Sequence, residues 1–423
     1  MRWARVLGLA VAITAALLTV RVELDKAGAL ILDKASWVLV AFSCWGIVGA
    51  CWRLWRRRLC AYYEAQAERE LAAARATDSV SSVASAPPAS PNSVRVRLLS
   101  YNVFIRPPGV TSHGNDYKDE RLGRILAQLI LRDADVVALQ ELFALGAPRR
   151  AAFLATAAKL GGYRYSTSLP YPPPLLCWPP KVVDGGVTIL SRHPIVASHH
   201  TTYRSAHWRY IDVLTAKGVL HARIALPAPL NTAQSSGRLE VDMFATHAQA
   251  GDIRHRGIAG VRRRQIHQLA TFLHRHGSAT RPLIVCGDLN VNGRRSATDS
   301  SDSEEYREMM QILQQSPRKG SADAIRPSFR DLLREEHHGT HPITVGDVDA
   351  DGRPVEHSLA GAKDRACRKR LDYVLVRETA SMPLDAIRTR VVTFRVQPPE
   401  KTPFEQLSDH YALESILDWK MNG

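Results

Sequence analysis

Polar side chains recur where apolar, strand-like segments of this chain end, and their types suit the hydrolysis of a phosphate ester. Taken singly, an Asp or Asn at such a place is usually a turn former or a helix cap. A joint, ordered occurrence at many strand ends is improbable for independent turn residues. The candidates are, in chain order, Asn102, Glu141, His247, Asp288, Asn290, Asp372, Asp409 and His410.

These residue types match the needs of metal-assisted hydrolysis. A phosphodiester is cleaved by an activated water in line with the leaving oxygen, while a cation neutralises charge on the phosphoryl oxygens. A carboxylate such as Glu141 suits Mg²⁺, which takes only one or two carboxylates and keeps several waters. The imidazole of His410 can act as a base near neutral pH without a large pKa shift.

The segments that carry the candidates alternate between strand and helix patterns. Residues 94–104 alternate as a strand does, and residues 118–133 have helical spacing. Many strands with interspersed helices predict one layered α+β domain over residues 94–423, with the polar residues held at its strand ends. Further strands are expected at residues 135–142, 186–192, 218–226, 239–247, 282–290, 371–376, 390–396 and 410–417.

Residues 1–60 hold two apolar stretches, Val6–Val20 and Ser36–Trp52, with cationic residues at both outer ends. Both are short for a full span. The flanks predict a membrane hairpin with both ends, and the catalytic domain, on the cytoplasmic side. A cleaved signal peptide at the first stretch and re-entrant insertion remain alternatives. Residues 61–93 begin helix-prone and continue as a Ser/Ala/Pro tract, which predicts a linker that is partly helical and partly flexible.

Charge and cysteine content narrow the class of partner without naming one. The net charge of +15 favours a polyanion, either nucleic acid or an anionic membrane surface. The six cysteines show no CxxC spacing, so neither a zinc site nor a disulfide framework is expected. The sequence does not determine the oligomeric state.

The ordered motifs SYN, QE, TH, GDxN, LDY and SDH resemble the endonuclease/exonuclease/phosphatase superfamily, which includes DNase I-like nucleases. The resemblance spans nearly all of residues 94–420. It implies a four-layered αββα sandwich with a metal site at one edge of the paired sheets. By the same resemblance Glu141 is the principal Mg²⁺ ligand, with Asn102 beside it and Mn²⁺ as a substitute metal.

The resemblance also implies a role for each of the other candidates. His410 would be the general base, oriented by Asp409. His247 would stabilise the transition state or protonate the leaving oxygen, with support from Asp372. The wall that faces the phosphate would be completed by Asp288 and Asn290.

One feature points to the substrate. Asp212 is followed five residues later by Lys217-Gly218, and this resembles the Asp/Lys pair that acts as a switch near the active site of neutral sphingomyelinases. With the apolar N-terminus, it predicts Mg²⁺-dependent, phospholipase C-type cleavage of sphingomyelin to ceramide and phosphocholine. The alternatives are cleavage of an inositol phosphosphingolipid and a DNase I-like nuclease. The N-terminal segments disfavour nucleic acid as a partner, and the intact candidate set disfavours a binding module with a decayed site.

Two other segments predict contact with lipid. Pro170–Pro180 is a stiff apolar loop, of the kind that docks at a membrane interface, unless it packs on its own domain. The basic run from Arg365 to Arg370 is expected to attract anionic headgroups. The side chains expected to touch the membrane are Leu175, Leu176 and Trp178.

Overall fold

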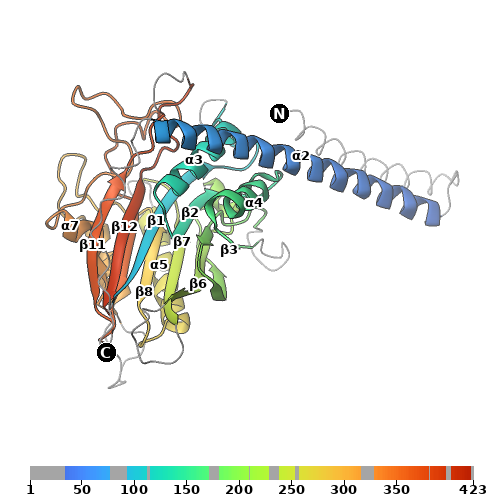
Figure 1. Cartoon of the computed structure of the whole chain (residues 1–423). Coiled ribbons are helices and arrows are strands. Elements are labelled where there is room, and N and C mark those ends of the chain that lie inside the picture. The colour runs from blue at the N-terminus through green and yellow to red at the C-terminus, as the bar shows by residue number, and fades with distance from the viewer. Residues whose placement is uncertain are drawn as a thin grey trace.

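Two six-stranded sheets packed face to face form the centre of the molecule (Figure 1). The computed structural model describes residues 34–76, 93–111, 115–170, 181–208, 210–227, 238–252, 257–315, 328–380, 382–396 and 402–420. The first sheet has the order β11-β12-β1-β2-β4-β3, and the second has the order β5-β6-β7-β8-β10-β9. The strands of the first sheet are β1 (Ser93–Ile105), β2 (Val136–Leu142), β3 (Tyr165–Ser168), β4 (Thr188–Ser191), β11 (Leu384–Val392) and β12 (Ala412–Lys420). Those of the second are β5 (Ile195–Thr202), β6 (Gly218–Pro227), β7 (Arg238–His247), β8 (Leu283–Asp288), β9 (Arg330–Asp331) and β10 (Asp372–Arg377).

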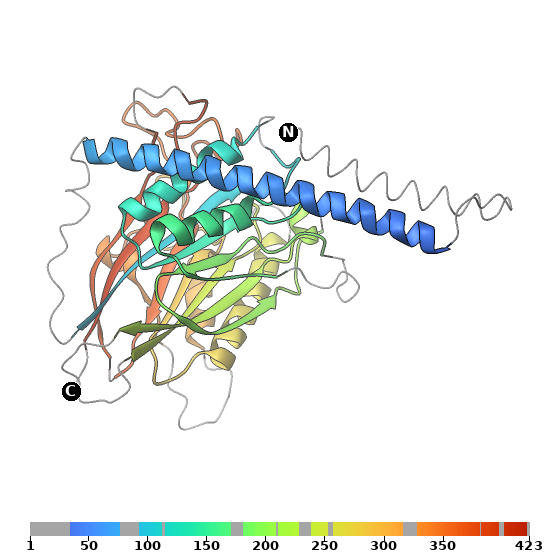
Figure 2. The same ribbon diagram turned by 45° about the vertical axis from the view of Figure 1, so that its right-hand side comes forward.

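Helices cover the outer face of each sheet (Figure 2). The first sheet is covered by α2 (Lys34–Ala76), α3 (Lys118–Leu131) and α4 (Arg149–Gly161). The second is covered by α5 (Ile258–His276) and α6 (Glu304–Gln314). Two short helices complete the described elements, η1 (Ile211–Leu214) and α7 (Leu332–Glu336).

Strand β1 shows why four layers form. Its side chains alternate, so Leu99 and Tyr101 point into the core beneath α3 and α4, while Val96 and Leu98 point into the core between the sheets. A strand that is buried on both faces needs a cover on each side. The predicted α+β sandwich of four layers is therefore confirmed.

Helix α2 is part of this packing. Its buried side chains recur every four residues at Trp55, Leu59, Tyr63 and Ala67. Such a repeat places them on one face of a helix, and this face joins the core formed with α3 and α4. The Tyr63 hydroxyl donates to Asp119 of α3 at 2.8 Å. Residues 61–76, assigned above to the linker, thus extend the helix and pack against the domain.

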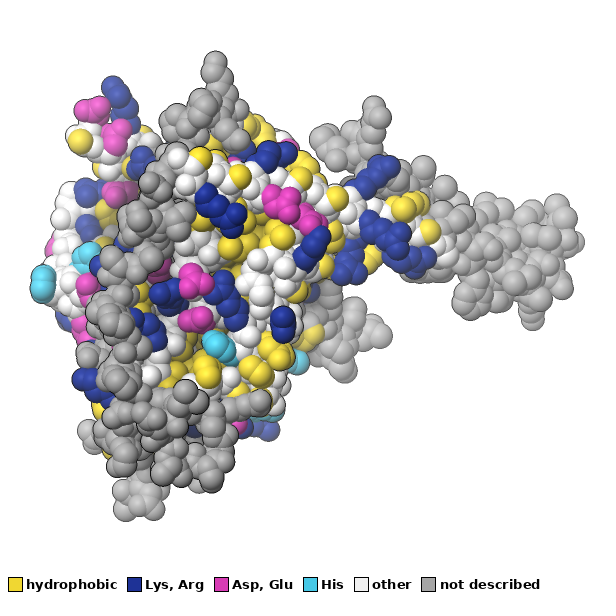
Figure 3. Space-filling model, viewed as in Figure 1, with side chains coloured by type: hydrophobic (Ala, Val, Ile, Leu, Met, Phe, Trp, Pro, Cys, Tyr) yellow, Lys and Arg dark blue, Asp and Glu magenta, His cyan; other side chains and the backbone are white. Residues whose placement is uncertain are grey.

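The first apolar stretch lies outside the described residues, and the second lies in α2. Among the described residues no helix has the length and apolar character needed to span a membrane, so the predicted hairpin is without structural support. The N-terminal part of α2 projects past the domain, and Lys and Arg side chains gather there (Figure 3). These include Arg53, Arg57 and Arg58, which are exposed.

Strand direction brings the candidate residues to one place. β1 runs parallel to β2, and β7 runs parallel to β8, so the strands of each pair end on the same side. The two pairs end next to each other, because Asn102 of β1 contacts Asp288 of β8. We call this side of the sandwich the site edge.

Candidate active site

Six of the predicted side chains meet at the site edge. The Asn102 amide donates to Glu141 at 3.2 Å and to Asp288 at 3.1 Å, which links the two sheets. The Nε2 atom of His247 lies 3.5 Å from Asp288 and 3.9 Å from Glu141. The remaining two members, Asp372 and His410, lie on the other side of Asp288.

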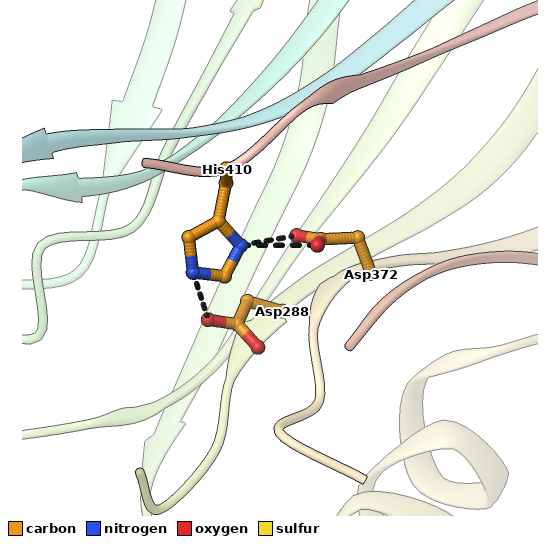
Figure 4. A group of neighbouring side chains, drawn as sticks. All are labelled: Asp288, Asp372 and His410. Atoms are coloured by element: carbon orange, nitrogen blue, oxygen red, sulfur yellow. Dashed lines mark hydrogen bonds and ion pairs between the residues drawn. The ribbon is translucent and has the colours of Figure 1, made fainter. Parts of the chain in front are cut away.

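The register of the second sheet places three of these residues in a row. His247 ends β7 opposite Asp288 of β8, and Asp288 lies opposite Asp372 at the start of β10. His410, just before β12, points into this row (Figure 4). Its Nδ1 atom lies 3.0 Å from Asp372, and its Nε2 atom lies 3.7 Å from Asp288.

This geometry corrects two predicted partnerships. His410 is held by Asp372, whereas the prediction gave this role to Asp409. The Asp409 carboxylate instead accepts from the Ser408 hydroxyl at 3.3 Å. Asp372 does not support His247, because β8 lies between β7 and β10 and separates them by two strand spacings of about 4.8 Å each.

Lys217 takes the place predicted for Asp372. Its ammonium lies 3.0 Å from Nε2 of His247, 3.0 Å from the Ala248 carbonyl and 2.8 Å from Asp212. A lysine has three N–H donors, and these contacts use all three. Nε2 of His247 therefore accepts a hydrogen bond, which leaves the imidazole proton on Nδ1. Asp212 in turn accepts from the backbone N–H of Ala250 at 3.0 Å.

The last member of the predicted set is Asn290. Its side-chain amide donates to the Ala248 carbonyl at 3.2 Å, and its backbone N–H donates to Asp288 at 2.9 Å. Asn290 thus fixes the turn after β8 and orients Asp288. Its expected contact with the phosphate stays a prediction.

The backbone around the site is strained. Glu141 has a φ of 57° and Asn290 a φ of 53°, in the left-handed region that non-glycine residues rarely adopt. Gly287 precedes Asp288 with a φ of 130°, and a Cβ there would meet the Thr246 carbonyl at 2.1 Å. Strain of this kind persists where the surrounding packing enforces it, often at functional sites.

Electrostatics set the two histidines apart. Burial and the adjacent Lys217 ammonium hold the pKa of His247 well below its usual value. Burial also opposes protonation of His410, but the carboxylates of Asp372 and Asp288 outweigh it and raise its pKa well above the usual value. These surroundings thus favour the neutral form of His247 and the protonated form of His410.

The carboxylates carry excess negative charge. Burial raises the pKa of Asp288, and Asp372 adds to the rise. Burial and Glu141 raise the pKa of Asp409 to about 6. A divalent cation between Glu141 and Asp288 would relieve this repulsion, and their carboxylate oxygens are hard ligands of the kind that Mg²⁺ prefers. The Asn102 side-chain oxygen already accepts from the Phe104 N–H at 3.1 Å, so Asn102 orients the two carboxylates through its amide nitrogen. The donor set therefore fits the predicted metal. The possible ligand atoms of Asp288, Asp372 and His410 lie even closer together. These three side chains already form hydrogen bonds and ion pairs with one another.

Three residues that hold the backbone or side chains of the site in place were not predicted from the sequence. Arg121 of α3 is fully buried and donates to four backbone carbonyls, including Val103 and Phe104 at the end of β1. The Ser408 hydroxyl donates to the Asn102 carbonyl at 2.6 Å, and the Thr344 hydroxyl donates to Asp372 at 2.6 Å. Their residue types are common everywhere, so only the fold reveals them.

The two predicted lipid segments have different outcomes. Leu175, Leu176 and Trp178 lie outside the described residues. In the basic run, Arg370 is fully buried and its guanidinium binds Asp331 at 2.6 Å. Arg370 therefore supports the fold from inside and does not face a headgroup.

Comparison with known proteins agrees with this geometry. A model of the Endonuclease/Exonuclease/phosphatase family matches residues 99–410. A sphingomyelinase of Dictyostelium discoideum is 27% identical over 76% of this chain and 98% of its own. A sphingomyelinase C of Leptospira interrogans is 25% identical over 53% of this chain and 38% of its own. Among solved structures, the beta toxin of Staphylococcus aureus shares the fold with a TM-score of 0.53 and 20% identity, over 76% of this chain and 99% of its own.

Proposed function

Because the chain belongs to the endonuclease/exonuclease/phosphatase family and is a phosphodiesterase-type hydrolase, we propose that it cleaves a sphingolipid between ceramide and its phosphorylated headgroup. The substrate that we favour is sphingomyelin, with ceramide and phosphocholine as products. The Dictyostelium relative, a sphingomyelinase by name, supports this substrate class.

The observation that carries the proposal is the contact between Lys217 and both Asp212 and His247. The Asp212/Lys217 spacing is the feature that resembles sphingomyelinases rather than nucleases. The Lys217 ammonium, which is paired with Asp212, also contacts His247 of the candidate site directly. The feature that suggests the substrate and the residues that suggest the chemistry therefore belong to one network.

In this reaction His410 is the general base. A water on the Nε2 side of its ring would pass a proton to the imidazole, while Asp372 fixes the ring through Nδ1. The imidazole must first be neutral, and positive charge near Asp288 favours that state. A bound Mg²⁺, which Glu141 and Asp288 would hold with Asn102 beside them, would supply such charge and neutralise the phosphoryl oxygens.

His247 stands across Asp288 from His410 and suits the leaving-group side. Its Nδ1 atom is buried and has no hydrogen-bond partner, while Lys217 occupies Nε2. The Lys217 ammonium beside Nε2 places positive charge on the side of the ring that faces Asp288, where it can stabilise a developing negative charge.

We further propose that the protein works at a membrane, on the side that its exposed arginines favour. Arg53, Arg57 and Arg58 follow the second apolar stretch on α2, and arginines beside an apolar helix favour the cytoplasmic face. Fractionation of cells that express the full chain, with protease protection of the catalytic domain, tests this arrangement. Cleavage of the domain in sealed cytoplasmic-side-in vesicles would contradict it.

The substrate is tested by headgroup release in detergent micelles, where membrane docking does not limit the rate. Sphingomyelin, an inositol phosphosphingolipid and plasmid DNA are compared with Mg²⁺, with Mn²⁺ and with EDTA, using mass spectrometry and gel mobility. We expect ceramide from sphingomyelin, its loss with EDTA, and its loss in His410→Ala. Ceramide from the inositol lipid alone would change the headgroup, and DNA nicking alone would overturn the proposal.

A further inference from the structure

We propose that an apolar patch beside the site edge, formed by Val182, Trp208 and Leu214, inserts into the bilayer interface and presents the active site to its substrate. This inference rests on the proposed function, since it assumes a lipid substrate. The indole of Trp208 is 73% exposed, the largest exposed fraction among the large hydrophobic side chains of the described residues. Val182 is 48% exposed and Leu214 is 36% exposed.

Strand topology places this patch at the site edge. The segment 203–217 joins the end of β5 to the start of β6, and the start of β6 pairs with the end of β7, where His247 lies. Val182 is tied to this segment, because its backbone N–H donates to the Leu214 carbonyl at 2.9 Å. Trp208 and Leu214 belong to this segment, so all three apolar residues lie on parts of the chain that adjoin the site edge.

The segment is anchored to the catalytic network. The His207 N–H, next to Trp208, donates to the Gln249 side chain at 2.9 Å, and the Gln249 amide donates to Asp212 at 3.0 Å. Asp212 binds Lys217, which contacts His247. A lipid surface that holds the indole thus holds a short chain of hydrogen bonds that ends at the site.

The chemistry of the surroundings favours a bilayer as the occupant. Tryptophan prefers the membrane interface, where its ring meets acyl chains and its N–H meets water. Arg204 and Arg264 are exposed, and the Arg264 guanidinium donates to Ser205 of the segment that carries Trp208 at 3.0 Å. Guanidinium groups pair well with lipid phosphates. A stable protein interface would need about 800 Å² per partner, more than three side chains supply.

The test compares a variant of the patch with a control variant at exposed hydrophobic residues far from the site edge. The patch variant carries Val182→Ser, Trp208→Ser and Leu214→Ser. The control variant carries Tyr165→Ser and Val196→Ser, two exposed hydrophobic residues at the opposite end of the sheets. Each is assayed on vesicles of sphingomyelin, phosphatidylcholine and phosphatidylserine and on a water-soluble aryl phosphocholine diester, and vesicle co-sedimentation measures binding.

We expect the patch variant to lose about tenfold or more of its vesicle hydrolysis and co-sedimentation, because each exposed apolar side chain contributes to insertion. Its rate on the soluble diester should match that of the wild type, and the control variant should match the wild type on both substrates. Equal losses on both substrates, or no loss on vesicles, would overturn the inference. So would a loss of self-association in the patch variant, which would make a second copy of the chain the occupant. Failure of the wild type to cleave sphingomyelin even in micelles would instead defeat the proposed function.

Discussion

Among the described residues, two buried histidine–aspartate pairs are joined by hydrogen bonds of similar length and differ in character. At the site edge, His410 Nδ1 lies 3.0 Å from Asp372. Farther back in the second sheet, His221 Nε2 lies 2.9 Å from Asp242. Both aspartates are buried, and neither distance nor burial separates the pairs.

The two pairs differ in the charges that surround their aspartates. Asp242 also accepts from Arg223 at 3.1 Å and from Arg281 at 3.0 Å. Burial alone would raise the pKa of Asp242, but the bonds from His221 and the two guanidinium groups lower it to about 2. Asp372 instead shares its imidazole with Asp288, a second carboxylate that lacks a guanidinium partner among the described contacts. Uncompensated negative charge, rather than a histidine–aspartate pair, marks the place where a cation and chemistry are expected.

The largest contrast should come from the histidines. His410→Ala removes the general base, and we expect kcat on sphingomyelin to fall by about 10³-fold. His221→Phe keeps the ring stacked on Phe244 and should leave kcat of the folded enzyme unchanged. Circular dichroism on both variants establishes that they are folded. Comparable kcat losses in the two variants would erase the distinction between the pairs.

A substitution of Lys217 tests whether the Asp212/Lys217 pair acts on the candidate site through His247. Lys217→Ala removes the cation that fixes His247, and we expect kcat on the soluble diester to fall by about 100-fold. Lys181→Ala is the matched control, because Lys181 is a buried lysine that donates to the Val213 carbonyl of the same segment. An equal fall in Lys181→Ala would mean that anchoring of the segment, and not contact with His247, sustains activity.

A substitution of Asp242 tests whether the His221–Asp242 pair contributes to the stability of the fold. Asp242→Asn removes the buried carboxylate that Arg223 and Arg281 share and leaves them only their longer contacts to Glu240, at 3.7 and 4.0 Å. We expect a loss of about 2 kcal/mol in the free energy of unfolding. Urea denaturation measures the loss, and kcat of the folded fraction should stay at the wild-type value. A fall in kcat without a change in unfolding would place Asp242 in the reaction after all.

The smallest effect concerns pH. Burial and the neighbouring His199, His221 and Arg275 lower the pKa of His276 from 6.5 to about 4, and Asp242 only partly opposes them. Since the unfolded chain takes up this proton first, the stability contribution is intact above pH 6.5 and declines as the pH falls toward 4. His276→Gln should flatten the decline in melting temperature over this window. An unchanged slope would show that other groups cause the acid sensitivity.

The local sequence determined the helices and strands and the identity of most residues of the candidate site. The alternating pattern of β1 and the helical spacing of α3 correctly predicted a strand and a helix, because each element buries its apolar side chains in the core of the domain. Asn102, Glu141, His247 and Asp288 converge because they lie where the strands of two parallel pairs end, which a pattern of strand ends is sufficient to suggest. His410 joins them because it precedes β12, which runs antiparallel to β1 and so begins where β1 ends.

Tertiary structure alone decided which of those residues act together. Chain order places Asp409 beside His410, but strand order gives that histidine to Asp372 and places β8 between Asp372 and His247. It also brings Lys217 across 30 positions to His247 and packs the helix-prone residues 61–76 onto the domain, while residues 77–92 of the predicted Ser/Ala/Pro tether lie outside the described residues. The physical reason is common to all three. Hydrogen bonds and close packing act over a few ångströms of space, and distance along the chain does not report distance between strands.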